Sequence, residues 1–100
     1  MPHSSKRKGN GFEREIVNQA QASGIESERA FASNGRSLGL TENVDAGIGP
    51  FKIQAKRRKK IADYLKPDSN VDVQVLRGDR EPAFAVIRYD ALLELIRDKQ

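Results

Sequence analysis

The sequence contains no cysteine and no tryptophan, and its only histidine is His3. Without cysteine the chain forms neither a disulfide nor a thiolate zinc site, and this composition is compatible with a cytosolic protein. A single histidine in a basic amino-terminal segment supports neither a zinc site nor histidine-based acid–base catalysis. These absences argue against the disulfide-stabilised, zinc-dependent and Ser/His/Asp classes of protein.

Long apolar runs are absent as well. No stretch approaches the roughly 20 apolar residues that a membrane-spanning helix needs, and no charged-then-apolar segment stands at the amino terminus. We therefore expect no membrane partner and no secretory signal. The length of 100 residues predicts one domain with a small core, which a partner subunit would help to cover.

Positive charge is plentiful and unevenly placed. The net charge is +4, but residues 1–60 hold twelve Lys and Arg against six Asp and Glu, whereas residues 61–100 hold six against eight. Eight of the cations stand in two runs, Lys6-Arg7-Lys8 and Lys56-Arg57-Arg58-Lys59-Lys60. Such clustering is typical of a surface that binds DNA or RNA. A solvated surface without a partner is the alternative.

Residues 43–56 predict the central element, a hairpin of two short strands joined at Gly49-Pro50. Apolar and polar residues alternate in both halves, as in strands with one buried face. If the turn is symmetric, Ile48 pairs with Phe51. Counting outward from that pair places Asp45 opposite Gln54.

The polar face of this hairpin gathers chemically useful groups. Asp45 and Gln54 would lie about 5 Å apart at Cβ, with Lys56 on the diagonal. The second basic run begins at Lys56, which favours the nucleic-acid interpretation of that run. An ordinary polar sheet face remains the alternative.

A helix is predicted from about Gly11 to Ser23, with an apolar stripe at helical spacing formed by Phe12, Ile16, Val17 and Ala20. Glu13 lies at the edge of that stripe and has no basic residue at i+4. Two interpretations stay open for it. Asn10 and Glu13 imitate a capping box, or Glu13 belongs to the site on the hairpin.

The remaining elements complete a mixed α/β order. We expect a flexible basic arm over residues 1–9 and one domain over residues 10–100. The other predicted elements are a strand at 28–33, a polar loop at 34–42, a short helix at 61–65, strands at 71–75 and 83–87, and a closing helix capped by Asp90. The closing helix should bury a stripe of Leu92, Leu93, Leu95 and Ile96. The strand at 83–87 is apolar throughout, as for a strand covered on both faces.

The hairpin resembles the core of the PD-(D/E)xK nucleases. Asp45 matches the signature Asp, Gln54-Ala55-Lys56 falls on the Glu-x-Lys, and Val44 replaces the usual proline. The whole chain is similar in element order to small archaeal-type and phage Holliday junction resolvases. Those proteins begin with a basic segment and a Glu-bearing helix, much as residues 8–15 do here.

The resemblance implies a restriction-endonuclease-like fold, with a mixed five-stranded sheet flanked by helices in the order α-β-β-β-α-β-β-α. It implies a Mg²⁺- or Mn²⁺-dependent endonuclease that cleaves branched DNA such as Holliday junctions. It also implies a homodimer, because two symmetric cuts need two sites, in the cytoplasm of a prokaryotic or virus-infected host.

The resemblance also implies roles for individual residues. The catalytic set is Glu13, Asp45, Gln54 and Lys56, and the metal ligands are Glu13, Asp45, Gln54 and the carbonyl of Ala55. Oxygen ligands of this kind suit Mg²⁺, and Lys56 would stabilise negative charge in the transition state. The expected DNA contacts are Lys6, Arg7, Lys8, Arg29, Ser33, Arg36, Ser37, Arg57, Arg58, Lys59 and Lys60, with Ser33 and Ser37 as alternative matches to one resolvase serine.

Gln54 departs from the family pattern. A neutral amide stands where a carboxylate is usual, so the site loses one negative charge and much of its attraction for a cation. Three explanations stay open: a natural variant with weaker metal binding, an engineered inactivation, or a nucleic-acid-binding module that does not cut. Glu42 could compensate only if the strand bends. A basic accessory protein that uses its Lys and Arg runs for protein contacts is a third class of function.

Overall fold

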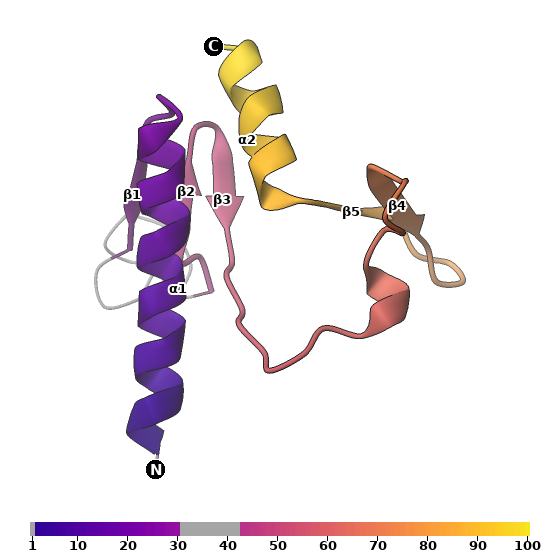
Figure 1. Cartoon of the computed structure of the whole chain (residues 1–100), viewed down its shortest axis with the longest axis horizontal. Coiled ribbons are helices and arrows are strands. Elements are labelled where there is room, and N and C mark those ends of the chain that lie inside the picture. Colours follow the sequence, from indigo (N-terminus) through magenta and orange to yellow (C-terminus); the bar gives the residue numbers. More distant parts are fainter. Residues whose placement is uncertain (1, 31–42) are drawn as a thin grey trace.

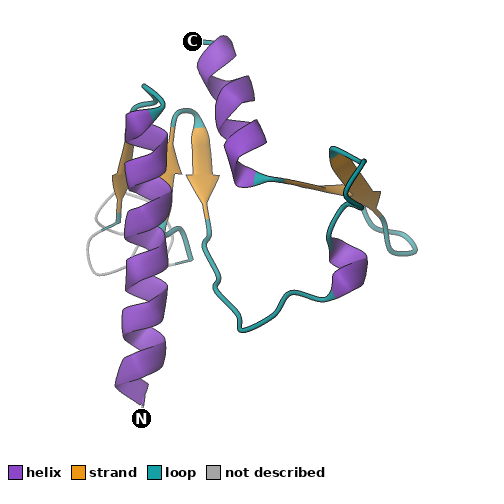
Figure 2. Ribbon diagram, viewed as in Figure 1, coloured by secondary structure: helices purple, strands orange, loops and turns teal. Residues whose placement is uncertain are grey.

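The computed structural model describes residues 2–30 and 43–100, with side chains from residue 11 onward in those ranges. It is a mixed α/β structure, as predicted (Figures 1 and 2). Its elements are α1 (Pro2–Ala22), β1 (Ser27–Arg29), β2 (Ala46–Ile48), β3 (Phe51–Ile53), the 3-10 helix η3 (Asp63–Leu65), β4 (Val73–Leu76), β5 (Phe84–Ile87) and α2 (Tyr89–Asp98). This order of helices and strands agrees with the order expected from the sequence.

The five strands form two separate antiparallel sheets rather than one sheet of five. One sheet has the order β1-β2-β3, and the other consists of β4 and β5 alone. Residues 54–62 follow β3 without entering any strand. This extended link, seen in Figure 1 as the long connection below α2, leads the second sheet away from the first. The link is polar and rich in cations, and of its residues Ala55 is the one packed against the core.

The central hairpin has the register that the sequence predicted. Ile48 pairs with Phe51, and the pairing continues to Ala46 and Ile53. Gly49 in the turn has a φ of +55°, a conformation that favours glycine. A Cβ at this position would also lie 3.2 Å from a methyl group of Ile96. The turn thus needs glycine both for its backbone and for close approach of α2.

The core lies between α1, the three-stranded sheet and α2. It is built from Ile16 and Ala20 of α1, Ile25, Ile48 of β2, and Leu93 and Ile96 of α2. The apolar stripe predicted for the first helix therefore faces the core, and its members Ile16, Val17 and Ala20 are buried. The stripe predicted for the closing helix is only partly buried, because Leu95 is 57% exposed.

Helix α1 begins at Pro2, not near Gly11. The segment expected to be an arm, residues 1–9, is therefore helical from Pro2 onward. Proline is well accepted at the first helical position because the amide it lacks would have no partner there. Asn10 lies within the helix, so it cannot be the N-cap, and the capping-box interpretation of Glu13 is wrong.

Helix α2 also begins differently from the prediction. Its N-cap residue is Arg88, and Asp90 stands in the first turn. The Asp90 carboxylate accepts hydrogen bonds from Arg88 Nε and Nη2, at 3.1 and 2.9 Å, and from its neighbour's backbone N–H. An acid in the first turn still favours the helix through the macrodipole, but the predicted Asp90 cap is wrong.

The expected coverage of the 83–87 strand on both faces is also wrong. Phe84 of β5 is 63% exposed and Val75 of the neighbouring β4 is 67% exposed.

In the described part of the chain no helix combines the length and apolar character that crossing a bilayer requires.

Tyr89 ties α2 to α1 and should make stability pH-dependent. Its hydroxyl donates a 2.7 Å hydrogen bond to the carbonyl of Ile16, and burial raises the pKa of Tyr89 to about 12. Because the unfolded value is about 10, the unfolded chain loses this proton first. The stability contribution is therefore complete below pH 10 and is lost as pH rises toward 12.

We expect Tyr89→Phe to lower the free energy of unfolding at neutral pH by about 1 kcal/mol and to reduce the loss of stability between pH 10 and 12. Urea denaturation across that pH range measures both effects. Tyr64→Phe is the matched control, since Tyr64 is 72% exposed. Equal pH profiles for the two variants would contradict the assignment.

Candidate functional site

At Asp45, the residue before β2, the regular pairing of the central hairpin is interrupted. The backbone N–H of Asp45 donates to the carbonyl of Ile53 at 2.7 Å, although Ile53 is already paired with Ala46. Asp45 and Ala46 are thus both opposite Ile53. Two successive residues opposite a single one form a β-bulge, which redirects side chains and is common beside functional sites. Counting from the turn therefore fails at Asp45, which is not simply opposite Gln54.

The Asp45 carboxylate is anchored to the following strand segment. Its Oδ2 accepts a 2.8 Å hydrogen bond from the backbone N–H of Ala55. Ala55 lies between Gln54 and Lys56, so this bond holds the acid against the three-residue stretch that resembles the nuclease signature. Among the described residues, the other oxygen, Oδ1, accepts no hydrogen bond. Asp45 thus keeps a ligating oxygen on a carboxylate whose position is constrained.

Glu13 projects from α1 onto the sheet and is buried, with 6% of its surface exposed. Its Oε1 lies 3.5 Å from Nη2 of Arg29 on β1. The Arg29 side chain is 27% exposed, while its Nε atom is buried without a hydrogen-bond partner. Arg29 was expected to contact DNA phosphates, but in this structure it is an internal counterion for Glu13.

Strand β1 connects the two carboxylates. Arg29 pairs with Ala46, the residue after Asp45, and the N–H of Ala30 donates to the Asp45 carbonyl at 2.9 Å. Glu13 is therefore linked to Asp45 through Arg29, the last residue of β1, and Ala30, which follows it. The structure brings these two predicted residues to the same end of the three-stranded sheet.

The other two predicted catalytic residues are on the surface. Gln54 and Lys56 are both exposed and belong to the extended link that leaves β3. Within the described ranges, no group of three or more His, Cys, Asp or Glu side chains is arranged to hold a metal ion. The donors fit a hard cation in kind, as carboxylate and carbonyl oxygens. The negative charge that these donors offer to a cation is small, because Gln54 is neutral and the Glu13 carboxylate is paired with Arg29.

The second basic run follows the site directly. Lys56 to Lys60 are all exposed and lie in the link without regular secondary structure. The weak ion pair between Lys60 and Asp63, at 3.9 Å, compensates only the end of the run. Five adjacent cations on an extended backbone can follow a phosphate chain, with a strength that falls steeply with salt.

The remaining predicted DNA contacts fall elsewhere. Lys6, Arg7 and Lys8 belong to the first turns of α1, where only the backbone is described. Ser33, Arg36 and Ser37 lie outside the described residues, as does Glu42.

Sequence reasoning missed the pairing of Glu13 with Arg29 as well as the bulge at Asp45. The two charged residues are sixteen positions apart and lie on different elements, so no helical or strand spacing relates them. The only available signal was the absence of a local partner for Glu13, which left its counterion to the tertiary structure.

Comparison with known proteins adds nothing to this geometry: the chain matches no protein-family model, no curated protein and no solved structure. The likeness to PD-(D/E)xK nucleases therefore consists of the short motifs and the order of elements described above.

The Glu13–Arg29 pair should contribute to folding. We expect Arg29→Ala to lower the free energy of unfolding by about 1–3 kcal/mol, because it removes the counterion of a buried carboxylate. Glu13→Gln combined with Arg29→Ala should recover part of that loss. Urea denaturation of both single variants and the double variant measures the coupling.

Arg14→Ala is the matched control, since Arg14 neighbours Glu13 on α1 but is exposed. We expect a change of about 0.5 kcal/mol or less for it. An equally small effect of Arg29→Ala would contradict a structural role for the pair.

Proposed function

We propose that this chain is a metal-dependent DNA endonuclease of the PD-(D/E)xK type that acts on branched DNA, such as Holliday junctions. The observation that supports this most directly is the 2.8 Å hydrogen bond from Ala55 N–H to the Asp45 carboxylate. It holds the signature acid beside Gln54 and Lys56, where the nuclease motif requires it.

The fold is consistent with this proposal at a coarse level. The order of elements and the antiparallel β1-β2-β3 sheet are those expected of a restriction-endonuclease-like scaffold. The finer part of the proposal is a mixed five-stranded sheet, which requires β4 and β5 to join the edge of a β1-β2-β3 sheet, either their own or that of a second chain.

Asp45, Glu13 and the carbonyl of Ala55 would hold the cation, with the amide oxygen of Gln54 as a weak further ligand. A bound Mg²⁺ or Mn²⁺ would supply charge neutralisation at the phosphate and a more acidic water. Asp45 positions the site through its bond to the backbone. Lys56, the residue after Ala55, would place an ammonium group near the phosphate and stabilise the negative charge that develops there. Arg29 must release Glu13 before that carboxylate can serve.

The segment Lys56–Lys60 would hold the phosphates on either side of the reacting one. Its position directly after the site favours DNA as the polyanion. Two chains would act together as a homodimer, because resolving a four-way junction requires two symmetric cuts. The same proposal places the protein in the cytoplasm, where such DNA is found in a prokaryotic or virus-infected host.

A nucleic-acid-binding module that does not cut is the second candidate, and two observations favour it. Gln54 brings no charge to the site, and Arg29 already neutralises Glu13 at 3.5 Å. Both lower the affinity for a divalent cation while leaving the basic segment unchanged.

We expect the chain carrying Gln54→Glu to nick four-way junction or flap DNA in Mg²⁺ or Mn²⁺, at a higher rate than the unaltered chain. Asp45→Asn should abolish cutting while an amide oxygen keeps the bond to Ala55, so its stability should change little. Gel assays of labelled junctions measure the rates. Asp72→Asn is the control, since Asp72 is an exposed acid outside the site. Binding without cutting by every form would favour the binding module instead.

The basic segment should dominate affinity. We expect Arg57→Ala with Arg58→Ala to weaken junction binding and to reduce the slope of log K against log salt by about 2. Titrations at several salt concentrations measure both. Arg77→Ala with Arg80→Ala is the charge-matched control, taken from the loop between β4 and β5. Equal losses in the two double variants would remove the special role of the segment, and no salt-dependent binding at all would leave only the accessory-protein class.

A further inference from the structure

The sheet of β4 and β5, here called the β4–β5 hairpin, stands apart from the rest of the fold (Figures 1 and 2). That remainder, here called the body, consists of α1, the β1-β2-β3 sheet and α2. Among the residues that the structure describes, the two strands of the hairpin pair only with each other. Val75 is 67% exposed and Phe84 is 63% exposed, and Val73 is also on the surface. Large apolar side chains are therefore concentrated on the element with the least support from the rest of the chain.

Both faces of the β4–β5 hairpin are apolar. Val73 pairs with Ile87 and Val75 with Ala85, so these four residues share one face. The other face carries three apolar side chains and Gln74. Isolated two-stranded hairpins are marginally stable in water. This one needs a surface that covers at least one of its faces.

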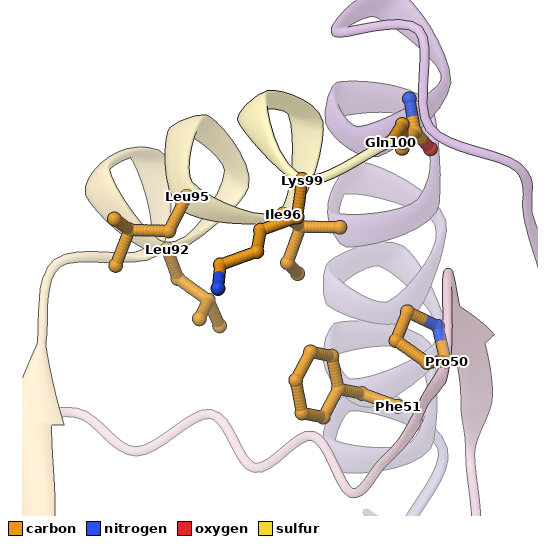
Figure 3. Close-up of a pocket in the computed structure, with 7 residues that line it drawn as sticks. All are labelled: Pro50, Phe51, Leu92, Leu95, Ile96, Lys99 and Gln100. Carbon is orange, nitrogen blue, oxygen red and sulfur yellow. The ribbon is translucent and has the colours of Figure 1, made fainter.

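The body carries an apolar groove between the β2–β3 turn and α2 (Figure 3). It has a volume of about 520 Å³ and is lined mainly by apolar residues, among them Pro50, Phe51, Leu92 and Leu95. Figure 3 shows the Phe51 ring on one side and the leucine side chains of α2 on the other, with Lys99 between them at the rim. Phe51 is 49% exposed.

We propose that the β4–β5 hairpin of one chain docks into this groove of a second copy of the same chain, and that the second copy returns the contact. The two identical contacts form a closed two-fold dimer. In it the β4–β5 hairpin is an arm, which each chain inserts into the groove of the other. This inference rests on the homodimer of the proposed function and names the surface that forms it; it does not depend on the chemistry at Asp45.

The chain's own connectivity favours a second copy as the occupant. Arg88 is the one residue between β5 and α2, and its backbone is extended. The hairpin is therefore attached directly to α2, the helix that forms one wall of the groove. A single extended residue gives it no turn by which to fold back onto that wall, and in Figure 1 it runs away from the body.

The exposed area is sufficient for a dimer. Phe51 and Leu95 in the groove, and Val73 and Val75 on one face of the hairpin, are between 41% and 67% exposed, which corresponds to about 100 Å² each. With Ala85 and Ile87 of the same hairpin face added, two reciprocal contacts would remove on the order of 1,000 Å² from water, the lower bound for a specific interface. Charge agrees, because residues 68–81 hold four acids and two arginines, whereas the groove has Lys99 at its rim.

Sedimentation equilibrium tests the proposal. We expect the unaltered chain to have twice the mass of the 11.2 kDa monomer, and Val75→Asp in the arm or Leu95→Asp in the groove to produce monomers. Both side chains are exposed, so far-UV circular dichroism should stay unchanged. Glu94→Ala, also exposed on α2, is the matched control and should remain a dimer. A monomeric unaltered chain, or dimers in both aspartate variants, would overturn the proposal.

A mixing experiment separates the reciprocal contact from its alternatives. Chains with Val75→Asp retain a groove and chains with Leu95→Asp retain an arm, so an equimolar mixture can form one intact contact. We expect the mixture to dimerise more strongly than either variant alone. A mixture no heavier than its components would refute the arm-in-groove contact. Loss of the dimer with Val75→Asp alone would show that hairpins pair with hairpins instead.

The absence of cysteine permits a direct second measurement. Val75→Cys chains mixed with Leu95→Cys chains should cross-link through a short bis-maleimide, whereas Val75→Cys chains by themselves should not. Cross-linking of Val75→Cys chains to one another would contradict the proposal. Neither readout uses DNA or metal, so failure here removes the arm-in-groove contact, whereas failure of the nuclease chemistry shows in the junction-cutting assay.

Discussion

The tight turn at Gly49–Pro50 is the constraint on which the rest of the structure depends. Gly49 has a φ of +55°, and Ile96 of α2 comes so close that a Cβ at this position would lie 3.2 Å from its side chain. The same turn sets the register of β2 with β3, and the bulge that follows brings Asp45 to the N–H of Ala55. The turn therefore determines how the core closes, and the candidate site forms where its regular pairing ends.

The two carboxylates at this site are satisfied in different ways. Asp45 accepts a hydrogen bond from a neutral backbone amide, so its charge stays available to a cation. Glu13 lies against the guanidinium of Arg29 at 3.5 Å. A divalent ion would therefore meet one available carboxylate, one carboxylate in competition with an internal cation, and a neutral amide at Gln54. This balance explains why both cutting and binding without cutting are chemically consistent with the same arrangement.

Some features could be predicted from the sequence because they depend on short-range patterns. Alternation around Gly49-Pro50 gave the correct pairing of Ile48 with Phe51, and helical spacing identified Ile16 and Ala20 as core residues. The start of α1 was mispredicted near Gly11, because a glycine costs about 1 kcal/mol in a helix but need not end one. The bulge at Asp45 was missed because no local residue pattern distinguishes it from regular pairing.

The sequence by itself determined the order of helices and strands, the hairpin register and the position of the basic segment, since each follows from neighbours a few residues apart. Only the tertiary structure decided that Arg29 would be the counterion of Glu13, that Asp45 would bind the Ala55 backbone, and that the five strands would divide into two sheets. Those outcomes depend on contacts between segments distant in the chain. Their energies are set by burial and packing, which residue spacing does not encode.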